Sequence, residues 1–230
     1  LSNLVAYSNF ESMGELTPEL KRELESQITL AVNRLQANQS YDGGWQWFTP
    51  ADRSEESSLI ATGYALLSLT RAEEAGFEVN EYIMTAGQDF LQANQKTPDN
   101  QSDSQAWQLQ AFLTYINRKN KLVTEDLLKD LFQVRSQLTP WAKAFLALSL
   151  NEKDPRDKRV RTLISDLESS AIRSATGAFW ESEAIWWSMP GTPAFTTAVV
   201  MCALADIKPA SPLLIDGLRY LVSLPQAGQR

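Results

Sequence analysis

The sequence contains no histidine and only one cysteine among its 230 residues. Without histidine there is no Ser-His-Asp or Cys-His catalytic machinery and no histidine-ligated zinc, because the usual neutral-pH base and metal ligand is missing. A single cysteine excludes an internal disulfide and a zinc site built from several thiolates, although it is compatible with an oxidising compartment. The composition thus argues against most histidine-dependent hydrolases and against structural zinc.

Basic charge and long apolar runs are also scarce. The chain has 21 Lys and Arg against 28 Asp and Glu, a net charge of −7, which argues against the clustered basic face of a nucleic-acid-binding protein. No apolar run approaches the roughly 20 residues that span a bilayer, so we expect no membrane insertion by this segment. A chain of this length buries about 70% of its unfolded surface around one core. We therefore expect a single domain over residues 1–230, and since Leu1 is not an initiator methionine, a processed chain or a fragment of a larger multidomain protein.

Helical periodicity recurs from end to end, whereas strand patterns are nearly absent. One set of segments is amphipathic and charged, at 20–35, 83–90, 127–131, 160–167 and 214–221. A second set lies between them and is almost uncharged, at 60–70, 104–117, 140–150 and 193–205. A helix that is apolar or small all round is enclosed on every side. We predict about ten helices, in which buried and amphipathic members alternate.

Each uncharged segment begins with a capping signal. These signals are Ser57 or Ser58, Ser102 or Ser104, Thr139-Pro140 and Thr192-Pro193. The alternation describes antiparallel helical hairpins that stack as an open solenoid or close as a ring. Four nearly chargeless helices fit a closed inner ring better, because an open solenoid needs polar faces on both sides of each layer. The predicted fold is all-α, an α/α toroid of helical hairpins.

A glycine-aromatic motif joins the first charged helix to the first uncharged one. It reads Gln39-Ser-Tyr-Asp-Gly43-Gly44-Trp45, in which the glycines end the helix and allow a turn with positive φ. A partial echo follows the fourth charged helix, where Ser174, Gly177 and Phe179 match Ser40, Gly43 and Trp45 in spacing. Coincidence of loop composition is one interpretation, and recurrence at the same kind of junction favours a repeat. The motif residues are therefore Gln39, Gly43, Gly44, Trp45, Gly177 and Phe179.

Gln39-x3-Gly43-x-Trp45 after an outer helix resembles the motif of terpenoid cyclases and their relatives, the α/α toroids that include the thioester domain of alpha-2-macroglobulin and complement proteins. Residues 16–48 and 60–95 look like the part of a bacterial alpha-2-macroglobulin thioester domain that follows its reactive helix, and 139–168 and 193–226 look like its last third. The resemblance implies a helical domain of a secreted or periplasmic broad-spectrum protease inhibitor with a defence role. It further implies an extracellular or periplasmic location, with neighbouring domains of the parent chain and target proteases as partners.

The sequence departs from that family in two respects. The reactive Cys-Gly-Glu-Gln motif is absent, and the only cysteine, Cys202, lies in the apolar run VVMCALA, where we expect a buried small hydrophobe. The thioester motif therefore lies upstream of Leu1 or is lacking in the parent. In the family a further hairpin would follow Arg230, so the resemblance implies an incomplete ring of six hairpins.

Aromatic and acidic residues gather near residue 180 and offer an alternative. Glu181 and Glu183 lie among tryptophans, as in a carbohydrate-active or carbohydrate-binding α/α toroid. Two carboxyls two residues apart are not thereby opposed across a sugar at the ~5 to 9 Å that glycoside hydrolysis needs. We expect no catalytic residue, no cofactor and no metal site. Packing in the core and loops is one interpretation of the tryptophans, and an interdomain surface is the other, with Trp47, Trp180, Trp186 and Trp187 as its residues.

Overall fold

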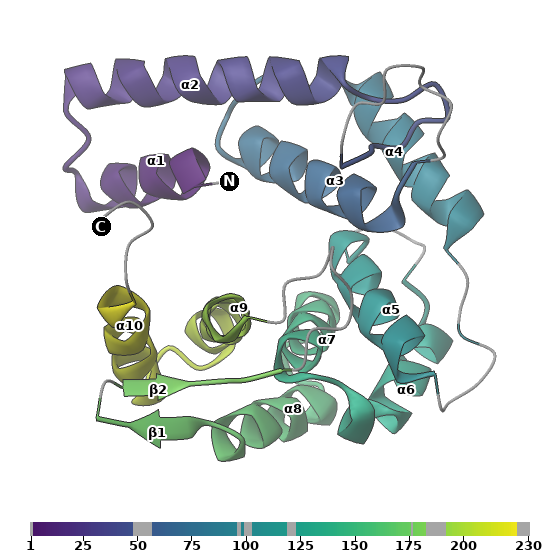
Figure 1. The fold of residues 1–230 in the computed structure, drawn as a ribbon, viewed down its shortest axis with the longest axis vertical. Helices are drawn as coiled ribbons and strands as arrows, with labels where there is room; N and C mark the ends of the chain where they lie inside the picture. Colours follow the sequence, from purple (N-terminus) through teal and green to yellow (C-terminus); the bar gives the residue numbers. More distant parts are fainter. Residues whose placement is uncertain are drawn as a thin grey trace. The chain divides into compact units, whose positions relative to one another are not determined.

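The structure, a computed structural model, is built mainly from helices (Figure 1). It describes residues 2–47, 57–95, 98, 103–118, 123–175, 177–182 and 192–224. The elements are α1 (Ser2–Met13), α2 (Pro18–Ala37), α3 (Leu59–Glu74), α4 (Glu81–Asn94), α5 (Ser104–Ile116), α6 (Glu125–Gln133), the 3-10 helix η1 (Arg135–Gln137), α7 (Pro140–Lys153), α8 (Lys158–Ser169), β1 (Ile172–Ser174), β2 (Gly177–Phe179), α9 (Pro193–Ile207) and α10 (Leu213–Ser223). The predicted all-α class is confirmed.

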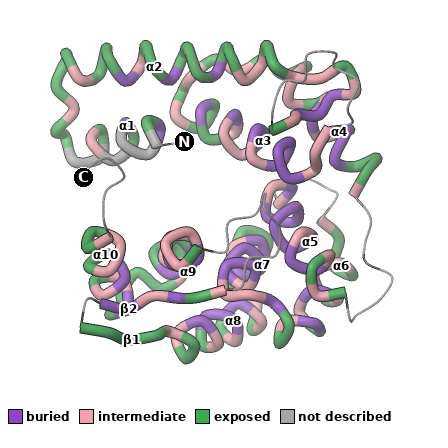
Figure 2. The backbone as a smooth tube through the Cα atoms, viewed as in Figure 1, coloured by how far each residue is buried: buried purple, intermediate pink, exposed green. Residues whose placement is uncertain are grey.

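The chain divides into two compact units, Leu1–Gln95 and Lys96–Arg230. In the first unit consecutive helices pack on one another: α1 on α2, α2 on α3 and α3 on α4. α2 is amphipathic as predicted, because Leu24, Ile28 and Val32 are buried on one face while charged residues occupy the other. α3 is the buried partner and carries several buried stretches (Figure 2). Its Leu66 and Leu69 are at most 2% exposed.

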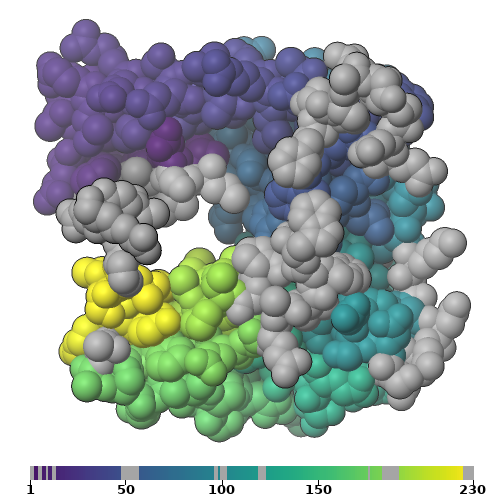
Figure 3. All heavy atoms as spheres, viewed as in Figure 1, coloured from purple at the N-terminus to yellow at the C-terminus, as the bar shows by residue number. Residues whose placement is uncertain are grey.

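In the second unit the predicted alternation of buried and amphipathic helices is observed. Helices α5, α7 and α9, which contain the nearly uncharged segments, pack side by side, since α7 contacts both of the others, and α6, α8 and α10 lie against them. α7 forms the centre of this unit, with Trp141 and Leu146 at most 1% exposed. Tyr115 of α5 stacks on Phe145 of α7 with ring centroids 4.8 Å apart. In the space-filling view α10, in yellow, lies directly against the green hairpin of β1 and β2 (Figure 3).

Capping residues start the buried helices largely where the sequence predicts. Ser58, Thr139 and Thr192 are N-caps whose hydroxyls accept a backbone N–H from the first turn. For α5 the prediction of Ser102 or Ser104 is wrong, because the Asp103 carboxylate accepts the N–H of Ala106 at 3.0 Å. Helix α1 and the three-residue strands β1 and β2, which pair antiparallel, were not predicted either.

Helix α9 is less enclosed than its composition suggested. Its buried face comprises Thr196, Thr197, Val200, Ala203 and Leu204. Cys202 and Ala205 are exposed, so the prediction of a buried Cys202 is wrong. The absence of charge from a helix does not decide which of its faces another element covers.

Candidate functional site

The glycines of the Gln39–Trp45 motif form a tight turn, the first junction, which lies against α4. Gly43 has φ +88°, and a Cβ there would be 2.5 Å from the carbonyl oxygen of Ala86. The Gly43 N–H donates to the Ser40 carbonyl at 3.0 Å, and the Ser40 N–H donates to the Gly44 carbonyl at 2.9 Å. Both the positive φ and the close approach to α4 require glycine at position 43.

Two side chains stabilise this turn. Gln39 donates two hydrogen bonds from Nε2, one to the Gly43 carbonyl at 2.8 Å and one to the Ile83 carbonyl at 2.9 Å. The Asp42 carboxylate accepts the backbone N–H of Gly44 at 3.1 Å and both the N–H and the hydroxyl of Ser57, the latter at 2.7 Å. The turn is therefore bonded to the start of α4 and to the residue just before the N-cap of α3.

Trp45 connects all three helices around the first junction. Its indole N–H donates to the Leu35 carbonyl in the last turn of α2 at 2.8 Å, and its backbone N–H donates to the Thr62 hydroxyl in α3 at 2.9 Å. The side chain is 3% exposed. Gly87 of α4 leaves room for the ring, because a Cβ there would be 2.8 Å from the Trp45 indole.

A second junction between α8 and α9 repeats these bonds with Trp180. Its indole N–H donates to the Leu167 carbonyl in α8 at 2.7 Å, and its backbone N–H donates to the Thr197 hydroxyl in α9 at 3.1 Å. Gly177 has φ +131°, and a Cβ there would collide with the Asp216 carbonyl of α10. Asp216 is followed by Gly217, which packs on Met201 of α9. In the first junction Ala86 is likewise followed by a glycine, Gly87.

The counterpart of Trp45 is thus Trp180, and the sequence alignment of Trp45 with Phe179 is wrong. One extra residue separates the glycine from the tryptophan in the second junction. That residue, Phe179, stacks its ring on Tyr220 of α10 with centroids 4.7 Å apart. Trp180 is fully buried, whereas the sequence predicted it on an interdomain surface.

The other predicted surface residues lie apart from this arrangement. Trp47 is 41% exposed and contacts the ring of Tyr64 at a centroid distance of 5.8 Å, and burial raises the pKa of Tyr64 to about 12. Trp186, Trp187 and Glu183 lie outside the described residues, and Glu181 is exposed.

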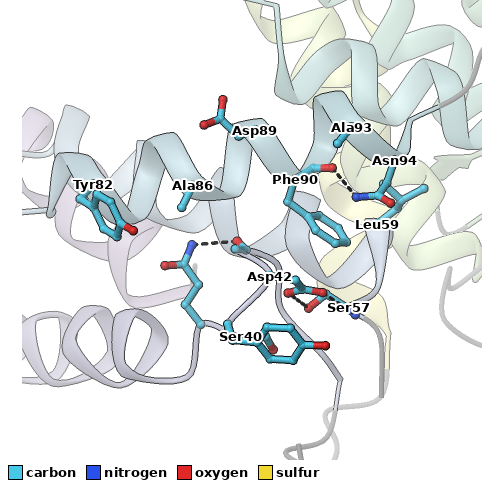
Figure 4. Close-up of a pocket in the computed structure, with 13 residues that line it drawn as sticks. Ser40, Asp42, Ser57, Leu59, Tyr82, Ala86, Asp89, Phe90, Ala93 and Asn94 are labelled. Atoms are coloured by element: carbon cyan, nitrogen blue, oxygen red, sulfur yellow. Dashed lines mark hydrogen bonds between the residues drawn. The ribbon is translucent and has the colours of Figure 1, made fainter. Parts of the chain in front are cut away.

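An open groove lies beside the first junction, between the turn and α4 (Figure 4). Its volume is about 930 Å³, and residues of α4 from Tyr82 to Asn94 form one wall. Tyr41 of the turn and Tyr82 of α4 are 84% and 77% exposed. Sequence reasoning missed this groove, because it forms only where the Gln39–Trp45 motif packs against α4, a segment about 40 residues further along the chain.

Charged side chains in the second unit form a network that links α6, α7 and α8. Arg159 donates to Asp157 at 2.6 Å and contacts Glu125 at 2.7 Å, and Lys153 contacts Glu125 at 3.1 Å. Hydrogen bonds from Arg159 hold the pKa of Asp157 below its usual value. Burial raises the pKa of Glu125, but hydrogen bonds from Lys153 and Arg159 outweigh it and the net shift is downward. These contacts connect the start of α6 to the end of α7 and the start of α8.

Within the described ranges no group of three or more Cys, Asp or Glu side chains is arranged to hold a metal ion. None of the helices in this part of the chain is long and apolar enough to cross a membrane.

Compared with models of known protein families and with curated protein sequences, the chain matches none. It is similar in fold to solved bacterial alpha-2-macroglobulins. Against Salmonella alpha-2-macroglobulin reacted with methylamine, the TM-score is 0.67 at 17% identity, over 94% of this chain and 14% of that one. Against the native conformation of the Escherichia coli protein, the TM-score is 0.69 at 14% identity, over 91% and 13%.

A shorter Escherichia coli structure, from domain MG7 to the C-terminus, gives a TM-score of 0.66 at 14% identity and is covered over 33% of its length. The chain therefore spans only a small part of each of these proteins. The resemblance drawn from the Gln39–Trp45 motif is borne out at the level of the fold.

Proposed function

We propose that this chain is the thioester-type helical domain of a secreted or periplasmic, alpha-2-macroglobulin-like protease trap with a defence role. The observation that carries the proposal is the fold similarity to bacterial alpha-2-macroglobulins over 94% of the chain. The two glycine–tryptophan junctions also support the proposal, because the first of them contains the Gln39–Trp45 motif on which the sequence resemblance is based. Closure of the hairpins into a toroid within a single domain is part of the same proposal.

In this proposal the role of the domain is mechanical. Cleavage of a bait segment elsewhere in the parent shifts its domains from one packing to another, and the protease becomes enclosed. The helical domain shields a thioester carried upstream or packs against neighbouring domains. No residue of the chain is assigned a catalytic role in this proposal.

The trap proposal is tested with the longer natural protein that contains this chain. Enclosure bars large substrates and admits small ones, so trypsin treated with the protein should stop cleaving casein but still cleave a small chromogenic peptide. Loss of both activities would indicate active-site inhibition, and retention of both would indicate no trap. Incorporation of radiolabelled methylamine tests the thioester separately, since only a reactive acyl group forms a covalent bond with the amine.

A further inference from the structure

The groove beside the first junction has the length of a short peptide. Its α4 wall runs from Tyr82 to Asn94, which corresponds to about 18 Å at 1.5 Å per residue. An extended chain advances about 3.3 Å per residue, so this wall matches about five residues. With a volume of about 930 Å³, the groove is too long for one side chain or a simple amine.

Three polar side chains of the lining, those of Gln39, Ser57 and Asn94, donate hydrogen bonds inside the protein. Gln39 uses both of its N–H groups on backbone carbonyls. The Ser57 hydroxyl donates to Asp42, and Asn94 donates from Nδ2 to the Phe90 carbonyl at 2.9 Å. The hydrogen-bonding capacity left to these groups consists mainly of acceptors.

One of the acceptors left without a partner, the Asp89 carboxylate, carries a negative charge. The amide oxygens of Gln39 and Asn94 and the carboxylate of Asp89 have no partner among the described residues, and Asp89 is exposed and projects from α4 on the side away from the turn (Figure 4). Asp42 adds a second carboxylate, and the groove lining contains no Lys or Arg among the described residues. Such a surface repels phosphates and carboxylates and favours ligands that only donate, such as ammonium and guanidinium groups.

Two tyrosines add a further preference for cations. Tyr41 and Tyr82 are the most exposed large apolar side chains in the part of the chain that the structure describes, at 84% and 77%. One belongs to the turn and the other to the facing wall of α4. The face of a tyrosine ring attracts a guanidinium or ammonium group through its quadrupole.

We propose that this groove binds an extended basic peptide segment of about five residues. The peptide's arginine or lysine heads lie against Tyr41 and Tyr82 and pair with Asp89. This inference does not depend on the protease-trap proposal, because it rests on groups within the first unit alone.

The test uses the 230-residue chain and fluorescence anisotropy of a dye-labelled pentapeptide with arginine at its second and fourth positions. The matched peptide carries citrulline, which keeps the shape and removes the charge. We expect binding of the arginine peptide only, weakened by added salt because exposed charges are screened. Asp89→Asn and Tyr82→Ser should each weaken binding by about threefold, the size expected for an exposed ion pair or cation–π contact.

Asp126→Asn is the control variant, since it makes the same change in net charge on exposed α6, outside the groove. It should leave the affinity within experimental error, and circular dichroism should show all variants folded. The proposal is overturned by equal binding of the citrulline peptide, by no binding, or by equal losses in Asp89→Asn and Asp126→Asn. Tighter binding of spermine or of a neutral chitooligosaccharide than of the peptide would also overturn it.

Discussion

The hydroxyl of Thr62 accepts the backbone N–H of Trp45 at 2.9 Å in the interior of the first unit. Thr197 does the same for Trp180 in the second unit, and both pairs are 17 residues apart. Each threonine lies near the start of a helix whose first turns carry no charge, and each tryptophan indole donates to a carbonyl near the end of the preceding amphipathic helix. In each junction the same three groups fix the end of one helix relative to the start of the next: the tryptophan indole N–H, the tryptophan backbone N–H and the threonine hydroxyl.

Replacing Thr62 with valine should destabilise the protein with little change in shape. Valine keeps the volume of threonine but leaves the buried N–H of Trp45 without an acceptor, which costs about 1–3 kcal/mol. Urea unfolding followed by circular dichroism measures the loss. Thr62→Ser retains the hydroxyl and should cost less than Thr62→Val; the reverse order would show that packing of the methyl group matters more than the hydrogen bond.

Gly43→Ala and Gly76→Ala form a matched pair. Both glycines have nearly the same positive φ, +88° and +85°, but a Cβ at Gly43 meets the Ala86 carbonyl whereas nothing lies within 4 Å of one at Gly76. Gly76→Ala should cost only the left-handed backbone penalty of about 1–2 kcal/mol. Gly43→Ala should cost clearly more, since α4 must also move away. Equal changes in the free energy of unfolding would contradict a close contact between the turn and α4.

Trp180→Phe and Phe179→Leu distinguish the two aromatic residues of the second junction. Trp180→Phe removes one of the two hydrogen bonds to the Leu167 carbonyl, which the Ser170 hydroxyl also donates to, and opens space in a fully buried site, so a loss of about 2–4 kcal/mol is expected. Phe179→Leu removes only a half-exposed ring stacked on Tyr220 and should cost about 1 kcal/mol. A larger loss for Phe179→Leu in urea titrations would restore Phe179 as the counterpart of Trp45.

Stability should fall in acid partly through Asp157. Because hydrogen bonds from Arg159 make its pKa lower in the folded than in the unfolded chain, the unfolded chain binds the proton first. The stabilisation is therefore present above the unfolded pKa of about 3.9 and is lost as pH falls through the folded value. Asp157→Asn keeps a residue suited to the N-cap of α8 and removes the charge.

The free energy of unfolding of Asp157→Asn should consequently fall less than that of the parent between about pH 5 and pH 3. Urea midpoints at the two pH values measure this difference. Identical acid losses in the two proteins would assign the acid sensitivity to other carboxylates, such as Glu168, whose pKa is lowered by a hydrogen bond from Lys208.

The first residue of a helix could be predicted from the sequence where a capping residue and a following proline determine it. Thr17, Thr139 and Thr192 each precede a proline, and each caps the helix that begins there. At α5 three polar residues stand in a row, and only the backbone angles select Asp103 as the cap. Strands of three residues are too short to produce a period-two pattern, so β1 and β2 gave no signal.

The junctions were only partly accessible to sequence reasoning. Their glycines and aromatic residues indicated a repeat. Aligning the two junctions at equal spacing matched Trp45 with Phe179, because nothing in the sequence indicates that the second junction has one extra residue. The threonines at 62 and 197 escaped notice, since a buried hydroxyl acceptor looks like any other small residue in an uncharged helix. The peptide-sized groove depends on side-chain exposure and on which donors are already used, and both are properties of the folded chain.

The outward position of Cys202 on α9 determines the outcome of oxidation. The 230 residues contain no second cysteine, so a disulfide between two parts of this chain is impossible and any disulfide must join Cys202 to another molecule. Air oxidation of the chain alone would then yield covalent pairs of twice the mass that reducing agent separates. Preparations of this protein are thus chemically uniform only while that sulfur is kept reduced or replaced by serine.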